Sequence, residues 1–281
     1  MNFTKVIETI LNEYLLIIFL MIAAAIPVGF FAGLFGIGGG LISVPFLFFI
    51  FELYGIDKEY LMHLTVGTAF TITILTSFSS VLTHKKHNAV DMSIIKSFGV
   101  FVIIGVVSGT IIASKMNTKS LVLFFAIMVY ILGAYLLLVK NNNKSALPSF
   151  NLLPRLTFGF ISGLISAPMG ITGAMINVPV LRYFGYTINR AIGSAAVIGF
   201  IISLFGAAGF FISGLYKEVD IPLSIGFVNI PAFFIFVPIT TYMARIGANT
   251  VHRLEKAKVQ VLFGIFLYVM ATIFLYRYFN I

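Results

Sequence analysis

The stretch GLFGIGGGLISVPFL, residues 33–47, places five glycines and a proline inside a long apolar region. Apolar residues run from Tyr14 to Phe35 before most of these glycines and from Gly40 to Tyr54 after them. Glycine lets the backbone leave a helix and lets another group approach closely, so this stretch predicts a break between two helices. Pro45 restricts the geometry of the second helix.

A weaker copy of the pattern, MGITGAMINVP, occurs at residues 169–179. Three further pairs match in the same order: Gly29-Phe30-x-x-Gly33-Leu34 with Gly159-Phe160-x-x-Gly163-Leu164, Gly67-Thr68-Ala69 with Gly193-Ser194-Ala195, and Val90-Asp91 with Val219-Asp220. Collinear matches indicate a duplication, which is common in secondary transporters. We therefore expect a first membrane repeat over residues 1–140, a linker over 141–152 and a second membrane repeat over 153–281.

The composition is that of a chain dissolved in lipid, with 60% hydrophobic and 10% charged residues and a mean hydropathy of +1.08. The net charge of +9 comes from lysines and arginines scattered between apolar runs, which is typical of topology signals and not of a nucleic-acid surface. The chain has no cysteine and no cluster with metal-ligand spacing. We expect no nucleic-acid partner, no metal and no cofactor.

Ten apolar segments are long enough to be helices, and in lipid the backbone has to be helical to satisfy its polar groups. They cover residues 14–35, 40–54, 61–83, 93–113 and 121–139 in the first half and 153–167, 171–184, 191–214, 221–243 and 259–279 in the second. The sequence thus predicts an all-α polytopic membrane protein with about five segments in each half.

Two of the segments, 40–54 and 171–184, are too short to cross a bilayer alone, since a crossing takes about 20 residues. Each could extend the preceding helix as one kinked crossing or fold back against it as a hairpin. The 18 lysines and arginines divide nine to nine in the kinked arrangement and twelve to six in the folded-back one. The positive-inside bias favours hairpins, and hence inverted repeats in the cytoplasmic membrane with both termini extracytoplasmic.

The glycine breaks are the best candidates for a solute site, because a broken helix directs free N–H groups and the positive end of its dipole into the membrane, where an anion can bind. All nine aspartates and glutamates fall in loops or at helix ends and none lies mid-membrane, which disfavours cation transport. Close helix packing is the alternative role for small residues, and we expect it for isolated glycines such as Gly105 and Gly109. The candidate substrate-binding residues are Gly36, Gly38, Gly39, Gly40, Ser43, Pro45, Gly67, Thr68, Gly170, Thr172, Gly173, Asn177, Pro179, Gly193 and Ser194.

The segment 33–47, followed by VGTA at residues 66–69 and by the second copy, resembles the sulfite exporter TauE/SafE family over nearly the whole chain. Members of that family are associated with export or uptake of sulfite, sulfonates and related organosulfur anions, so the resemblance implies a permease for such a solute, which we expect to be an exporter. The duplication predicts that it works by alternating access. Thr172 and Ala174 depart from the fuller glycine motif, which leaves the solute's identity open. The residues that match the family motif are Gly36, Gly38, Gly39, Gly40 and Pro45 in the first copy and Gly173, Asn177 and Pro179 in the second.

Three other functions remain as alternatives. An anion channel could use the same glycine-lined pathway, and flux saturation separates it from a carrier. A membrane enzyme would need a base or a metal cluster beside the serines and threonines of the spans, and the sequence offers none, so we expect no enzymatic activity. A scaffold subunit would leave the glycine breaks without a purpose. The expected partners are a small anion and the lipid bilayer, and a homo-oligomer is compatible with the sequence.

Overall fold

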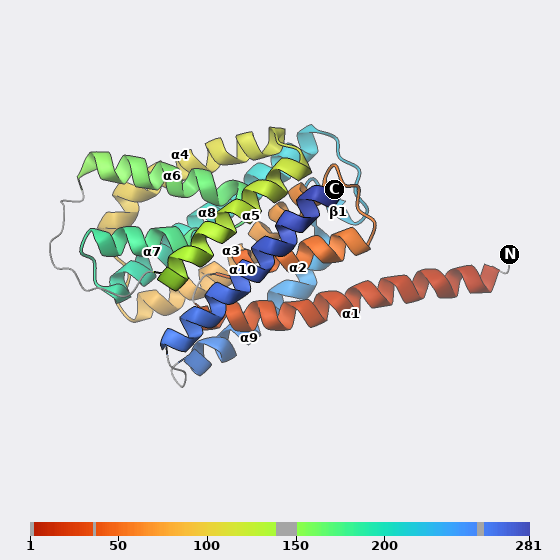
Figure 1. The fold of residues 1–281 in the computed structure, drawn as a ribbon, viewed down its shortest axis with the longest axis horizontal. Coiled ribbons are helices and arrows are strands. Elements are labelled where there is room, and N and C mark those ends of the chain that lie inside the picture. The colour runs from red at the N-terminus through yellow and green to blue at the C-terminus, as the bar shows by residue number, and fades with distance from the viewer. Residues whose placement is uncertain (1–2, 36–37, 139–150, 252–255) are drawn as a thin grey trace.

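The computed structural model describes residues 3–35, 38–138, 151–251 and 256–281, and in these ranges the chain is almost entirely helical. The helices are α1 (Phe3–Phe35), α2 (Gly40–Leu53), α3 (Leu61–Lys86), α4 (Met92–Lys115), α5 (Thr118–Leu138), α6 (Leu152–Met169), α7 (Ala174–Tyr183), α8 (Ile188–Tyr216), α9 (Ile230–Val251) and α10 (Lys256–Asn280). Eight of them are long and apolar enough to cross a membrane. The predicted all-α polytopic membrane fold is confirmed. The N-terminal part of α1 extends beyond the other helices (Figure 1).

The two short helices fold back along the helices that precede them. Tyr54, which follows α2, lies against Tyr14 near the start of the first span, with 6.2 Å between ring centroids. Phe184 directly follows α7 and lies 5.7 Å from Phe158 on α6. Both pairs are hairpins, so the folded-back alternative is confirmed and the kinked crossing is wrong.

Two pairs of corresponding helices from the two halves pack antiparallel. Phe78 of α3 contacts Phe200 of α8, whereas Phe70, earlier on α3, contacts Phe210, later on α8. Helix α10 runs antiparallel to α5 in the same way. These directions are those that an inverted duplication gives, while the inversion across a membrane stays a prediction.

The first helix of each half packs on the fourth helix of the other half. A Cβ atom on Gly33 of α1 would overlap the carbonyl oxygen of Ala244 on α9, and one on Gly163 of α6 would overlap that of Val102 on α4. Gly105, on α4, meets the carbonyl oxygen of Phe160 in the same way. These glycines therefore allow backbone-to-backbone contact between membrane helices, as expected for small residues spaced four apart.

The start of α9 differs from the sequence-based expectation. The predicted segment at 221–243 begins with a small antiparallel hairpin of β1 (Ser224–Ile225) and β2 (Val228–Asn229), and the helix starts only at Ile230. Positive φ angles at Leu223 and Gly226, 55° at each, turn the chain here. Asp220 is therefore not at a helix start, and Asn229 caps α9 by accepting a hydrogen bond from the Ala232 N–H at 3.0 Å.

The predicted linker at 141–152 lies outside the described residues as far as residue 150, and α6 begins at Leu152.

Helix α2 is the most enclosed part of the first half. Its Phe48 packs against Phe274 of α10, with 5.0 Å between the ring centroids, and Phe125 of α5 packs on the same ring at 4.6 Å. The short hairpin helix therefore lies inside the bundle, where its broken N-terminus faces other helices and not lipid.

Candidate functional site

The structure brings the two glycine breaks into contact. A Cβ atom on Gly40 would overlap the carbonyl oxygen of Gly170, and one on Gly38 would lie 2.8 Å from the Cγ2 atom of Thr172. Helix α2 starts directly after Gly39, and α7 starts directly after Gly173. Two helix N-termini from different halves therefore open beside one shared point. Of the predicted residues, Gly36 lies outside the described part of the chain.

Glycine is required at these breaks because the backbone is left-handed there. The φ angles are 70° at Gly38, 89° at Gly39, 69° at Gly170 and 67° at Gly173. Residues with a side chain rarely adopt such angles. Pro45 and Pro179 each stand sixth in their helices, where the missing proline N–H weakens the first turns.

The meeting point lies about halfway along the two central helices. Thr76 of α3 donates a hydrogen bond to the carbonyl oxygen of Gly38 at 3.0 Å, and Gly199 of α8 packs on Thr172. Close by, the hydroxyl oxygens of Thr73 and Ser203 lie 3.1 Å apart where α3 and α8 pack together. Since both helices are long enough to span a membrane, the breaks lie deep between their ends.

Hydroxyl and amide groups surround the breaks. Ser43 donates to the carbonyl oxygen of Gly39 at 3.0 Å, and Ser162 donates to Oδ1 of Asn177 at 2.7 Å. Ser166, four residues after Ser162 on α6, is also buried beside the second break. Ser162, Ser166 and Thr76 were not among the residues predicted from the sequence. The spacing of Ser162 and Ser166 on one helical face was the available signal for α6.

Carboxylate groups lie away from this point. The acidic residues of the described chain lie in loops, at helix ends or in α1 before its first span: Glu8, Glu13, Glu52, Asp57, Glu59, Asp91, Glu218 and Asp220. The same part of the chain has no group of three or more His, Asp and Glu side chains that could hold a metal ion. Thr172 is only 3% exposed, and the glycines from Gly39 to Gly40 and from Gly170 to Gly173 are buried. Gly38 is half-buried. The site is neutral and polar, and the point where Gly40 meets Gly170 is closed to solvent in this conformation.

Comparison with known proteins assigns the chain to a family. The family described as sulfite exporter TauE/SafE matches residues 20–274. The chain belongs to the TauE/SafE family. A Haemophilus influenzae protein named "Probable membrane transporter protein" is 27% identical over 86% of this chain and 92% of its own length. A "Probable membrane transporter protein" of Methanocaldococcus jannaschii is 24% identical over 94% and 97%. No solved structure matches.

With eight helices among the described residues that are long and apolar enough to cross a membrane, this TauE/SafE protein is a multi-pass membrane transporter.

The remaining predicted residues of this TauE/SafE protein lie away from the breaks, in two similar contacts. Thr68 of α3 accepts a hydrogen bond from the Asn229 N–H at 2.9 Å, while Gly67 packs against the preceding loop. In the other half, Ser194 of α8 accepts one from the Asp91 N–H at 3.1 Å, while Gly193 packs on Ala89. Each contact holds the loop that precedes a fourth helix.

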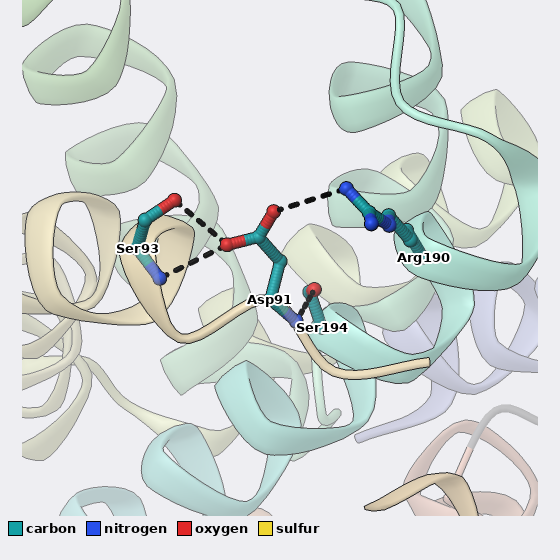
Figure 2. Close-up of polar contacts among 4 residues, drawn as sticks. All are labelled: Asp91, Ser93, Arg190 and Ser194. Carbon is teal, nitrogen blue, oxygen red and sulfur yellow. Dashed lines mark hydrogen bonds and ion pairs between the residues drawn. The ribbon is translucent and has the colours of Figure 1, made fainter. Parts of the chain in front are cut away.

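Figure 2 shows the contact at Asp91. Its carboxylate accepts hydrogen bonds from the N–H of Ser93 at 3.0 Å and from the Ser93 hydroxyl at 2.7 Å, and Arg190 lies 3.8 Å away. The hydrogen bonds from Ser93, followed by the charge of Arg190, hold the pKa of Asp91 below its ordinary value. Asp91 is the N-cap of α4, and its structural counterpart in this TauE/SafE fold is Asn229 and not Asp220, which the repeat had matched to it.

Proposed function

We propose that this protein is a carrier that exports a small sulfur-containing anion, such as sulfite or a sulfonate, across the cytoplasmic membrane. The observation that carries the proposal is the contact between the two glycine breaks, Gly38–Gly40 and Gly170–Gly173, deep in the bundle. There the N-termini of α2 and α7 present N–H groups to one point from which carboxylates are far. Such a point suits an anion without any fixed positive charge.

The expected strength of this site suits transport. A helix N-terminus stabilises a negative charge by about 0.3–1 kcal/mol, and by up to about 2 kcal/mol where it is partly buried. Two such termini hold an anion firmly enough to select it and weakly enough to release it. The membrane potential adds about 2.3 kcal/mol per charge for each 100 mV, which favours the exit of an anion from a cell that is negative inside.

Alternating access follows from the way the site is built. Each break belongs to a hairpin of a different half, and the point between them is closed to solvent. A solute can reach that point only when the two hairpins separate towards one side. We therefore propose that the halves move relative to each other and expose the breaks to one side at a time.

The test is uptake of radiolabelled sulfite and of a short sulfonate into proteoliposomes. Gly39→Leu and Gly173→Leu are compared with wild type after correct insertion has been shown. Gly55→Leu is the matched control, because Gly55 also has a positive φ, 79°, but nothing lies within 4 Å of its missing Cβ. We expect saturable flux that both break variants abolish and that the control retains.

Each other result has a defined meaning. Flux that rises linearly with concentration supports the anion channel instead of the carrier. The absence of flux for either solute removes the proposed solute class. Unchanged flux in both break variants would place the pathway elsewhere in the bundle.

A further inference from the structure

The two breaks differ in how their polar side chains are hydrogen-bonded. In the repeated motif, Asn177 occupies the position of Ser43. The hydroxyl of Ser43 is used within its own hairpin, since it donates to the carbonyl oxygen of Gly39 at 3.0 Å. The amide Nδ2 of Asn177 has no hydrogen-bond partner in the described part of the chain, although the residue is 0% exposed. The two copies of the motif therefore differ in the hydrogen bonding of their corresponding polar side chains.

A second buried donor lies beside the first. The hydroxyl of Ser166 also lacks a partner among the described residues, and Ser166 is 0% exposed. Both groups lie beside Gly173, because a Cβ atom added there would lie 2.8 Å from Ser166 Oγ and 3.1 Å from Asn177 Nδ2, with Cδ1 of Ile202 also at 2.8 Å. Buried polar groups in proteins are nearly always hydrogen-bonded, so two adjacent exceptions point to a ligand.

The surrounding residues fix the direction of these donors. Ser162 donates to Oδ1 of Asn177 at 2.7 Å, which occupies the acceptor side of the amide and leaves Nδ2 on the side of Gly173. Helix α7, ten residues long, begins at Ala174, directly after Gly173. Its first N–H groups have no partner inside the helix, and its dipole makes that end positive. Side-chain and backbone donors thus face the same small region.

We infer that the second break is the oxyanion subsite, in which Ser166 Oγ, Asn177 Nδ2 and the N-terminus of α7 donate to oxygen atoms of the solute. An Asn amide nitrogen can only donate, so the bound group must present acceptor oxygens, as a small oxyanion does. The first break, whose Ser43 hydroxyl is already bonded, closes against this subsite and does not coordinate the solute with its side chains. The inference rests on the proposed function only in taking the solute to be a small anion.

Equilibrium binding tests the inference separately from flux. The full chain, purified in detergent, is titrated calorimetrically with sulfite and with methanesulfonate. Loss of one hydrogen bond to a charged group weakens binding by about 10- to 100-fold, which is expected for Asn177→Ala and for Ser166→Ala. Asn177→Asp keeps the acceptor for Ser162 but replaces the donor with a negative oxygen, so it is expected to abolish binding.

The control is Thr157→Ala on the same helix as Ser166. Thr157 is half-buried and its hydroxyl donates to the carbonyl oxygen of Leu153 in its own helix, so binding should stay at the wild-type value. Thermal unfolding of every variant shows whether it is folded. Ser43→Ala is expected to weaken binding less than Asn177→Ala does.

Two results would overturn the inference while leaving the proposed function in place. The first is a folded Asn177→Asp variant that binds the anion with wild-type affinity. The second is a loss of affinity in Ser43→Ala that equals or exceeds the loss of affinity in Asn177→Ala. A wild-type protein that binds neither anion would overturn the inference and the proposed solute class together.

Discussion

The contact between the breaks predicts an unusual response to the smallest substitution, Gly40→Ala. Gly40 is the first residue of α2, and alanine is ordinarily better than glycine in a helix by about 0.5–1 kcal/mol. Here the added methyl group would overlap the carbonyl oxygen of Gly170 and lie 3.1 Å from Cα of Ile171. Both obstacles are backbone atoms, which cannot rotate away as a side chain can. We expect the two hairpins to be forced apart.

Gly99→Ala provides the matched comparison. Gly99 lies within α4 and is buried, but the nearest atoms to an added methyl group are side-chain carbons of Ile201 and Ile95 at 3.6 and 3.9 Å, which is ordinary contact. This variant should therefore keep the gain in helix stability. Overpacking a well-filled interior costs about 1–3 kcal/mol, so Gly40→Ala should be less stable than Gly99→Ala by about that amount.

Thermal unfolding in detergent or lipid measures the difference. At about 2–4 °C per kcal/mol for a chain of this size, the two variants should unfold roughly 2–12 °C apart. Anion flux in proteoliposomes should fall in Gly40→Ala and remain in Gly99→Ala. Equal unfolding temperatures together with full flux in Gly40→Ala would show that the breaks do not meet as described.

Three further predictions concern the loops and the topology. Thr68→Ala should destabilise the protein by about 1–3 kcal/mol, because it leaves the N–H of the buried Asn229 unpaired. Ser194→Ala should destabilise it less, because water can replace the hydrogen bond to the partly exposed Asp91. Thermal unfolding of the two variants measures the difference. The fold lowers the pKa of Asp91, so the contribution of its carboxylate to stability is present above its ordinary pKa of about 4. That contribution is lost as the pH falls through the lower pKa of the folded state. The stability difference between wild type and Asp91→Asn should therefore shrink in unfolding measurements at acidic pH. Since the chain has no cysteine, Lys58→Cys and Lys86→Cys, both exposed, can be labelled singly in intact cells with an impermeant maleimide; only the first should react, and the opposite result would contradict the predicted orientation.

Most of the fold could be predicted from the sequence, because long apolar runs indicate membrane helices and glycines indicate where those helices are interrupted. The distribution of lysine and arginine favoured hairpins, and the contacts of Tyr54 with Tyr14 and of Phe184 with Phe158 agree. The start of α9 was misplaced because residues 221–229 are mostly apolar, and apolar content does not distinguish a short β-hairpin from the first turns of a helix. The match of Val90-Asp91 with Val219-Asp220 reinforced that error, since Val228-Asn229 fits the structure better.

The candidate site could be predicted only in part. Gly38, Gly39, Gly170 and Gly173 were recognised because a left-handed backbone demands glycine, which leaves a trace in the sequence. Ser162, Ser166 and Thr76 were not, because their place beside the breaks depends on how α6 and α3 pack, which the spacing of Ser162 and Ser166 on one helical face does not reveal. Gly67, Thr68, Gly193 and Ser194 recur in both halves, and the structure places them at the loops before α9 and α4.

The first helix of each half packs on the fourth helix of the other half, and this pairing sets an order for assembly during synthesis. When α6 enters the membrane, the glycine face of α4 that receives it is already there. Helix α1 has no such advantage, because α9, which meets Gly29 and Gly33, is made long after it. Helix α1 thus waits in the membrane until most of the second half has been made. A chain cut short after the first half would hold two glycine-lined helix faces in lipid with nothing to cover them, and each half therefore depends on the other to finish folding.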